Sequence, residues 1–215
     1  MDAAAREAGR SPQEVQLLAV SKTWPAQYVR IAALAGQRSF GESYVQEALP
    51  KLAELADLPL EWHFIGPLQS NKTQAVAEHF AWVHGVDREK IALRLSQQRP
   101  PTLPALQVCL QVNISGEPSK GGVAPAELPA LAHAVARMPR LSLRGLMAIP
   151  APAEDDREAR RPFAQLRQLL LQLNSEGMKL DTLSMGMSAD LDAAIAEGAT
   201  LVRVGTAIFG ERETK

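Results

Sequence analysis

The sequence repeats one local pattern along its length: a short apolar run, a turn, and then an amphipathic stretch with the period of a helix. Eight such runs are predicted strands: Gln16–Val20, Arg38–Phe40, Glu61–Ile65, Trp82–Val86, Ala105–Val112, Leu143–Ile149, Thr182–Met185 and Thr200–Val204. Seven helices are predicted between them: Pro25–Leu34, Tyr44–Ala56, Lys72–Phe80, Arg88–Gln97, Pro125–Met138, Asp156–Ser175 and Ala189–Glu197. This alternation predicts parallel strands joined by helical crossovers.

The strands are rich in Leu, Val and Ile without polar alternation, which is typical of strands buried on both faces. Eight β/α units within 215 residues favour an α/β fold closed into a single (β/α)8 TIM-like barrel. We expect residues 1–215 to form one domain. A doubly wound open sheet is the alternative, and we favour the barrel because the candidate site residues are distributed over many strand ends.

Composition excludes several classes of partner. With 46% hydrophobic residues, 22% charged residues and a net charge of −1, the chain offers nothing that attracts nucleic acid or an anionic membrane. No run approaches the roughly 18 to 20 apolar residues of a membrane-spanning helix, and the N-terminal segment lacks the apolar centre of a signal peptide. The single cysteine, Cys109, and the scattered His79, His84 and His133 indicate no disulfide and no metal site. We therefore expect a cytoplasmic protein.

In such barrels the functional groups lie where strands end and the following loops begin. The first predicted strand is followed by Ser21, Lys22 and Thr23. Burial at the end of an apolar strand lowers the pKa of a lysine, and the neutral amine is the form that attacks an aldehyde. The alternative is a solvated lysine that snorkels from the end of the strand.

Three further strand ends carry weaker signals. Gly41 permits a tight turn, and Ser43 is placed to cap the next helix. Polar donors are dense between residues 63 and 72, where we expect His63 to be a hydrogen-bonded core residue rather than a catalyst. Residues 112–122 form a long glycine-bearing loop, either a lid or a flexible connection. Glu42 and Glu117 show no visible pairing, so no carboxylate dyad is assigned.

The last two strand ends are candidates for binding a phosphate. Barrels often bind phosphate with the loops after the seventh and eighth strands, at a helix N-terminus. Ser188 offers a hydroxyl there, Gly205 allows close approach of the backbone, and Thr206 adds a hydroxyl and an N–H. The alternative is a capped helix with a glycine turn. Arg203 shares strand parity with Gly205, and a buried arginine in a barrel requires acceptors.

Taken together, these segments resemble the YggS/PROSC family of pyridoxal 5'-phosphate (PLP) binding proteins. The matching motifs are AVSKT (19–23), FGESYVQE (40–47), HFIGPLQSNK (63–72), VNISGEPSKGG (112–122), RGLMAIP (144–150), LSMGMSAD (183–190) and VRVGTAIFG (202–210). They span nearly the whole chain in the family's order. The resemblance implies a fold-type III barrel similar to the N-terminal domain of alanine racemase, with PLP as the cofactor.

The resemblance also implies roles for individual residues. It implies a Schiff base between PLP and Lys22, a phosphate near Ser188, Gly205 and Thr206, a pyridine nitrogen facing Arg203, and a pocket lined by Met147 and Ser184. Two features depart from the family pattern. Ser43 stands where the family usually has an asparagine, which reaches further toward a cofactor. The family also usually has a longer first helix, so either this helix is short or the chain is truncated.

The leading hypothesis is a carrier that takes part in PLP homeostasis, passes PLP to apo PLP-dependent enzymes and has no robust turnover, and we expect it to be a monomer. The first rival is an amino-acid racemase, and the second is a barrel that binds another phosphate ester. Alanine racemase adds a C-terminal β-domain with a catalytic tyrosine, and we expect none here because Lys215 ends the chain five residues after Gly210. Of the two tyrosines, Tyr28 and Tyr44, only Tyr44 remains a candidate acid or base, so no catalytic residue is assigned.

Overall fold

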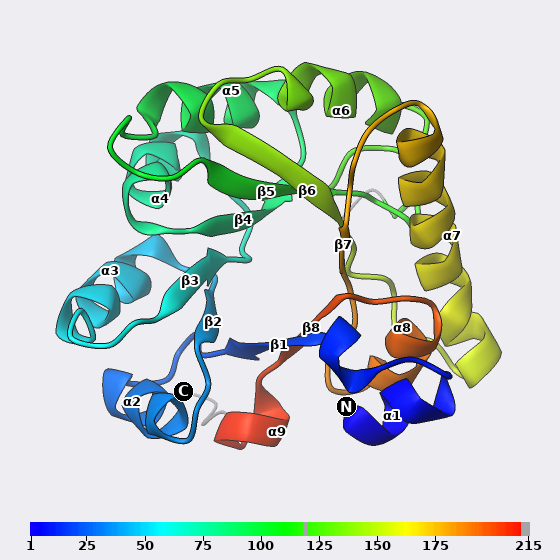
Figure 1. The fold of residues 1–215 in the computed structure, drawn as a ribbon, viewed down its shortest axis with the longest axis horizontal. Helices are drawn as coiled ribbons and strands as arrows, with labels where there is room; N and C mark the ends of the chain where they lie inside the picture. Colours follow the sequence, from blue (N-terminus) through cyan, green and yellow to red (C-terminus); the bar gives the residue numbers. More distant parts are fainter. Residues whose placement is uncertain (118–119, 212–215) are drawn as a thin grey trace.

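The computed structural model describes residues 1–117 and 120–211, and a closed barrel of eight parallel strands in sequential order lies at its centre (Figure 1). The strands are β1 (Gln16–Val20), β2 (Ser39–Glu42), β3 (Glu61–Phe64), β4 (Trp82–Val86), β5 (Leu106–Gln111), β6 (Leu141–Met147), β7 (Thr182–Ser184) and β8 (Leu201–Val204). Pairing of β1 with β8, from Gln16 opposite Leu201 to Ala19 opposite Val204, closes the sheet. The predicted barrel is therefore confirmed, and the open sheet was the wrong alternative.

The second strand differs from its sequence prediction. Gly41 and Glu42, expected in a turn, continue β2 and pair with His63 and Phe64 of β3. The parallel ladder thus extends past the apolar run, because backbone hydrogen bonds to a neighbouring strand do not depend on the side chains. β6 likewise begins at Leu141, two residues before the predicted start, and pairs there with Leu106 of β5.

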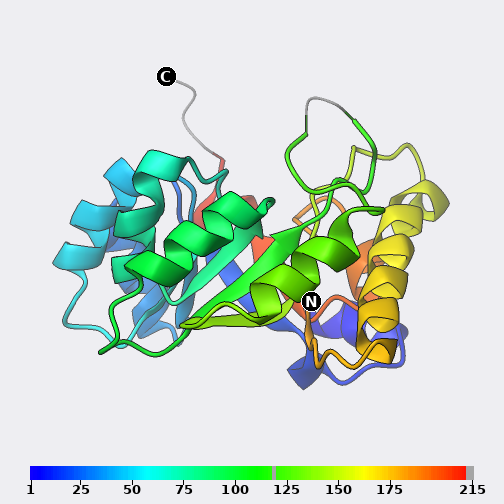
Figure 2. The ribbon, with the colours of Figure 1, turned by 90° about the horizontal axis from the view of Figure 1, so that it is seen from above.

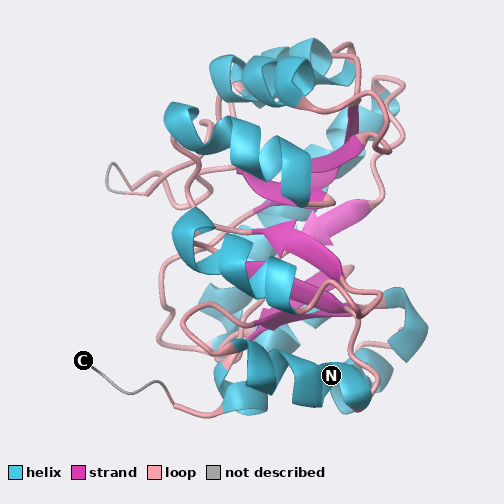
Figure 3. Cartoon of the chain, turned by 90° about the vertical axis from the view of Figure 1, so that its left-hand side faces the viewer, coloured by secondary structure: helices cyan, strands magenta, loops and turns pink. Residues whose placement is uncertain are grey.

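Helices surround the barrel on its outer side (Figure 3). They are α1 (Asp2–Glu7), α2 (Ala26–Leu34), α3 (Val45–Glu54), α4 (Thr73–His79), α5 (Glu89–Gln98), α6 (Leu128–Ala136), α7 (Asp156–Ser175), α8 (Leu191–Ala196) and α9 (Thr206–Phe209), with short 3-10 turns at Pro12–Glu14 and Ser70–Lys72. The helix α9 was not predicted, because a single turn is too short to show helical periodicity.

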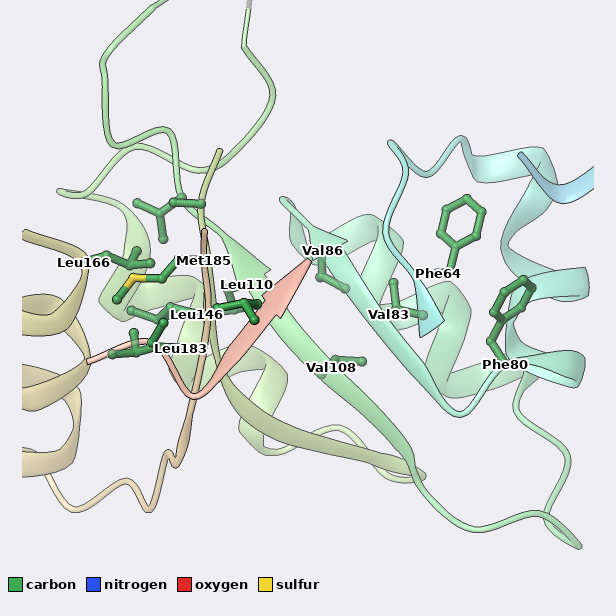
Figure 4. Close-up of a cluster of buried hydrophobic side chains, with 14 of the residues drawn as sticks. Phe64, Phe80, Val83, Val86, Val108, Leu110, Leu146, Leu166, Leu183 and Met185 are labelled. Atoms are coloured by element: carbon green, nitrogen blue, oxygen red, sulfur yellow. The ribbon is translucent and has the colours of Figure 1, made fainter. Parts of the chain in front are cut away.

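The main core lies between the strands and the helices. Figure 4 shows Phe64, Val83, Leu110 and Leu146 among the side chains of this layer, and Phe64 meets Phe80 edge to face with centroids 5.4 Å apart. Such aromatic pairs add stability beyond the area that they bury. Because this layer contains side chains from strands all around the barrel, it fixes the positions of the strand ends.

The other face of the sheet lines the barrel interior and carries a smaller cluster of Trp82, Cys109 and Met147. Cys109 is fully buried, as predicted for a small core residue, and burial raises the pKa of its thiol to about 12. Buried polar side chains of His63, His84, Ser184 and Arg203 also lie in the interior, which distinguishes the inside of this barrel from its outer layer.

The N-terminal segment packs beside α8 (Figure 1). Ala4 and Ala5 of the short helix α1 are buried there, and the Arg10 guanidinium donates to the carbonyl oxygens of Ile195 at 2.9 Å and Ala199 at 2.8 Å. A short first helix therefore still covers this part of the outer surface.

Within residues 1–117 and 120–211, no helix combines the length and the apolar character needed to cross a membrane. Within the same residues, no three His, Cys, Asp or Glu side chains are grouped in a way that could hold a metal ion.

Candidate functional site

Lys22 lies two residues beyond the end of β1 and is half-buried. The next residue, Thr23, has a φ of 70°, a left-handed conformation that is uncommon for a β-branched side chain. Its backbone N–H donates to Oε2 of Glu47 on α3 at 3.2 Å. Backbone strain of this kind persists where the surroundings hold it and often marks a functional site. The conformation after Lys22 is therefore imposed by the fold.

A buried ion pair supports the same strand end. The Lys51 ammonium donates to Oε1 of Glu42 at 2.6 Å and to the carbonyl oxygen of Ser21 at 2.8 Å. The Ser21 hydroxyl also donates to Oε1 of Glu42, at 2.6 Å. These contacts tie α3 to the ends of β1 and β2, directly beside Lys22.

This pair was missed in the sequence, where Glu42 had no visible partner. A signal was present, because Lys51 falls on the buried face of α3 with Val45 and Ala48. A lysine in an apolar helix face requires an acceptor. Burial raises the pKa of Glu42, although Lys51 and Ser21 act to lower it.

On β8, the strand that pairs with β1 and closes the barrel, Arg203 lies in the interior and is 4% exposed. Its Nη1 donates to the carbonyl oxygen of Ser184 at 2.6 Å and to the Ser184 hydroxyl at 2.8 Å, and its Nη2 donates to the carbonyl oxygen of Ala148 at 2.9 Å. The acceptors that the sequence required are therefore present. Burial lowers the pKa of Arg203 to about 10, so the guanidinium remains charged at neutral pH.

Two histidines continue this network across the interior. Nδ1 of His84 lies 2.8 Å from the Ser184 hydroxyl, and Nε2 of His84 lies 2.9 Å from Nδ1 of His63. Nε2 of His63 then contacts Oε1 of Glu61 at 2.9 Å. His63 is a hydrogen-bonded buried residue, as predicted, whereas the place of His84 was missed. The available signal was strand alternation, which turns His63 and His84 to the same side of neighbouring strands.

The predicted phosphate residues lie after β7 and β8. Gly205 is the N-cap of α9, and Thr206 is its first residue and is exposed. The N–H groups in the first turn of a helix lack acceptors within the helix. Ser188 is exposed in the turn before α8, whose N-cap is Asp190, so Ser188 does not lie at the helix terminus where the sequence placed it. The two loops are adjacent, because the Arg203 N–H donates to the carbonyl oxygen of Gly186 at 2.9 Å.

The other two predicted residues lie on β6 and after β2. Met147 is 1% exposed and is opposite Ser184 in the β6–β7 register. Ser43 is half-buried, and its carbonyl oxygen lies close to Gly66. A Cβ atom on Gly66 would lie only 2.3 Å from that oxygen. The eight predicted residues therefore come from β1, β2, β6, β7 and β8, all toward the carboxyl ends of these parallel strands.

The sequence matches a known family over nearly its whole length. The family model for the N-terminal domain of alanine racemase matches residues 3–213. The pyridoxal phosphate homeostasis protein of Pseudomonas aeruginosa is 66% identical over 210 residues, which cover 98% of this chain and 90% of the relative. The chain belongs to the YggS/PROSC family of pyridoxal phosphate homeostasis proteins.

Solved structures agree with this assignment. PipY of Synechococcus elongatus with PLP bound is 43% identical, with a TM-score of 0.86 over 96% of this chain and 97% of that chain. Alanine racemase from Corynebacterium glutamicum, at 18% identity, has a TM-score of 0.70 over 98% of this chain and 59% of that chain. The second likeness shows the fold alone, which is that of the fold-type III barrel.

In this YggS/PROSC member the loop between β5 and α6 projects from the barrel (Figure 2). Of the motif at 112–122, residues 118 and 119 lie outside the described residues. The Asn113 amide donates to the carbonyl oxygens of Glu117 at 2.8 Å and Lys120 at 3.2 Å, and Val112 bridges Val123. The base of this loop is thus closed by hydrogen bonds.

The two tyrosines lie on the outer elements. Tyr44 is the N-cap of α3 and is 50% exposed. Tyr28 of α2 is 39% exposed and packs against Trp24, with ring centroids 5.0 Å apart. Trp24 also stacks on Phe209 of α9, at 5.9 Å. Tyr28 is therefore part of an aromatic contact outside the barrel.

Proposed function

We propose that this protein binds PLP through a Schiff base on Lys22, serves in PLP homeostasis, and does not turn over amino acids at an enzymatic rate. The observation that carries the proposal is the arrangement of three groups at the carboxyl ends of the strands. Lys22 offers an amine, Arg203 offers a buried guanidinium, and Thr206 lies in an exposed helix turn with N–H groups available. These groups suit an aldehyde, an acceptor nitrogen and a phosphate respectively.

The relatives support the same ligand. The P. aeruginosa protein is named a pyridoxal phosphate homeostasis protein, as is the Escherichia coli K12 protein, which is 56% identical over 219 residues. PipY has been solved with PLP bound. Identity of this degree over nearly the whole chain supports transfer of the ligand, with Lys22, Ser43, Met147, Ser184, Ser188, Arg203, Gly205 and Thr206 as the proposed binding residues.

The proposed lack of turnover rests on Arg203 together with the need for a second proton-transferring group, because racemases of this fold also tolerate an arginine at this place. When bound, PLP supplies a ring that can accept electrons from a substrate. A guanidinium can only donate a hydrogen bond, so a pyridine nitrogen that faces Arg203 would stay unprotonated. The ring would then accept electrons less readily. Lys22 can hold or move a proton on one face of a substrate, and the exposed Tyr44 is the only tyrosine that we retain as a candidate for the other face.

A carrier role completes the proposal. A monomer in the cytoplasm would keep the reactive aldehyde bound to Lys22 and release it to apo PLP-dependent enzymes. The exposed positions of Ser188 and Thr206 support such exchange, because a phosphate bound there remains near solvent.

Borohydride reduction tests the attachment site. Reduction of the PLP-loaded protein, digestion and mass spectrometry should place the phosphopyridoxyl group on Lys22. The visible absorption band of the loaded protein near 420 nm should disappear on reduction, and Lys22→Ala should show neither signal. A modified Lys72 or Lys120 with an unmodified Lys22 would overturn the assignment.

The phosphate site is tested with Thr206→Val. A hydrogen bond to a charged group is worth about 1.5–3 kcal/mol, which corresponds to roughly 10- to 150-fold in affinity. We expect this loss for PLP and almost none for pyridoxal, which lacks the phosphate. Equal weakening of both ligands would remove Thr206 from the phosphate site.

The absence of turnover is tested by racemisation of alanine, serine and lysine, followed by chiral chromatography. We expect rates far below about 1 s⁻¹, the lower end of ordinary enzyme turnover. A rate at or above that value that is abolished by Lys22→Ala would establish the racemase alternative. Tyr44→Phe and His63→Gln would then identify the second proton-transferring group.

A further inference from the structure

A continuous chain of hydrogen bonds crosses the barrel interior from one mouth toward the other. It runs from Glu61 through His63, His84 and Ser184 to Arg203, with successive contacts of 2.9, 2.9, 2.8 and 2.8 Å. These residues come from β3, β4, β7 and β8. Glu61 starts its strand and has a side chain that is 44% exposed, whereas the other four residues are buried. The chain therefore links the opposite mouth to the proposed binding site.

The donors and acceptors allow one direction for this chain. Arg203 can only donate, so the Ser184 oxygen accepts from it. An ionised Glu61 can only accept, so Nε2 of His63 must carry a proton. Nδ1 of His63 then accepts from Nε2–H of His84. Burial keeps both imidazoles neutral, so Nδ1 of His84 carries no proton and accepts from the Ser184 hydroxyl. From Arg203 toward Glu61, each group therefore donates to the next.

The electrostatic surroundings favour this arrangement. Burial lowers the pKa of His63, an effect that Glu61 only partly opposes, and burial lowers the pKa of His84 well below its ordinary value. The hydrogen bond from His63 lowers the pKa of Glu61. At neutral pH the chain therefore has a carboxylate at one end, a guanidinium at the other, and two uncharged imidazoles between them.

The far end of the chain is open to solvent. Glu61 and Trp82 line a cleft of about 480 Å³ at the amino ends of the strands, together with Gln107 and Arg144. The ring of His63 stacks on Trp82 at 5.3 Å with an interplanar angle of 6°, which holds the imidazole plane. The orientation of His63 is thus set by packing as well as by hydrogen bonds.

We infer that Glu61, His63 and His84 are positioning residues that act through Ser184 to hold Arg203 toward the pyridine nitrogen of PLP. This inference rests on the proposed function for the ligand, but the chain itself is a property of the free protein. Hydrogen bonds aligned in one direction polarise one another, so the carboxylate at the far end strengthens the hold on Arg203. Residues on β3 and β4 thereby act on a ligand that they do not touch.

The direction of the chain is tested first, in the protein without ligand. Nitrogen-15 NMR of the four histidines, each assigned by replacing it, reports the tautomer of every ring. His63 and His84 should both be neutral and protonated on Nε2 at pH 7. Either ring protonated on Nδ1, alone or in an imidazolium, would overturn the inference whether or not the protein binds PLP.

The positioning role is tested with PLP and its 1-deaza analogue, in which a carbon replaces the pyridine nitrogen. His84→Phe keeps an aromatic ring but leaves the Ser184 hydroxyl without its acceptor. This variant should weaken the binding of PLP about 3- to 10-fold, the worth of one ordinary hydrogen bond, and leave the affinity for the 1-deaza analogue unchanged. Equal weakening of both ligands would mean a merely structural role and would overturn the inference.

Glu61→Gln provides a second variant that fills the same volume at a half-exposed position. It should shift affinity in the same direction by a smaller factor, again for PLP alone. Glu78→Gln is the matched control, because Glu78 lines the same cleft and is outside the chain. An effect of Glu78→Gln equal to that of Glu61→Gln would overturn the inference. If the unaltered protein binds PLP no better than the analogue, the contact proposed between Arg203 and the pyridine nitrogen is refuted. The NMR result still tests the direction of the hydrogen-bond chain in the free protein.

Discussion

Glu42 and Glu61 lie on neighbouring strands of one barrel, yet they are held in opposite ways. Glu42 ends β2, is fully buried, and meets the Lys51 ammonium of α3 on the outer face of the sheet. Glu61 starts β3, is half-buried, and accepts from His63 inside the barrel. Burial raises the pKa of Glu42, whereas the hydrogen bond from His63 lowers the pKa of Glu61.

The comparison shows that either desolvation or hydrogen bonding can dominate the pKa of a glutamate in this barrel. For Glu42, the loss of hydration raises the pKa by more than the contacts with Lys51 and Ser21 lower it, as is common for fully buried ion pairs. Glu61 keeps part of its hydration, so its hydrogen bonds dominate. Residues that share a side-chain type therefore differ because of the face and the strand end that they occupy.

The largest expected effect comes from breaking the buried pair. Lys51→Met leaves the Glu42 carboxylate buried without its cation, which should lower the free energy of unfolding by about 3–5 kcal/mol. Urea unfolding at neutral pH measures it. The double variant Lys51→Met with Glu42→Leu removes both charges and should return to within about 1 kcal/mol of the unaltered protein or exceed it. A double variant as unstable as the single one would show that the pair is itself strongly stabilising.

Breaking the interior contact at Glu61 should cost less. Glu61→Gln keeps a possible acceptor for His63 and changes a partly hydrated group, so we expect a loss of less than about 1.5 kcal/mol, the usual range for one hydrogen bond. The same urea titration measures this loss. A cost as large as that of Lys51→Met would contradict the contrast between the two glutamates.

The two carboxyl groups should also give pH dependences of opposite sign. The pKa of Glu61 lies below its ordinary 4.5, so its contribution to stability is present above 4.5 and is lost as pH falls through the lowered value. The pKa of Glu42 lies above 4.5, so its contribution is present below 4.5 and is lost as pH rises through the raised value. Unfolding of Glu42→Gln and Glu61→Gln across the acidic range, each relative to the unaltered protein, should give slopes of opposite sign. Slopes of the same sign would refute the assignment of these two shifts.

A surface ion pair gives the smallest effect and serves as the reference. Arg30 on α2 contacts Asp57 at 2.6 Å, where both side chains are exposed. Solvent screens such pairs, so Arg30→Ala should leave the urea midpoint unchanged within error and should not alter PLP binding. A clear loss of stability would show that exposed pairs of this barrel contribute more than their hydration suggests.

Much of the fold could be predicted because its signals are local. The alternation of apolar runs with amphipathic stretches located all eight strands and the helices α2 to α8, with boundaries shifted by a few residues. The fold and the family were both confirmed. Strand ends were less certain, because pairing with a neighbouring strand decides where a ladder stops. This is why Gly41 and Glu42 continue β2 although their sequence favours a turn.

From local pattern, the candidate site could be predicted where its residues follow a strand or share strand parity with one that does, as Arg203 does with Gly205; Met147 and Ser184 came from the family resemblance. Lys22, Gly205 and Thr206 were found in this way, and their roles in binding stay predictions. Lys51, Glu61 and His84 were missed, because each depends on a contact between elements. The partner of His84, Ser184, is 100 residues away along the chain.

By itself, the sequence determined which segments are strands and helices, which strand ends carry polar groups, and which family the chain belongs to. Those properties follow from the spacing of neighbouring residues and from ordered motifs. Only the tertiary structure decided that Glu42 meets Lys51 on the outside and that Glu61 connects to Arg203 through the interior. The physical reason is that a closed barrel sets the register and facing of all strands together, and the partners of buried polar side chains follow from that closure.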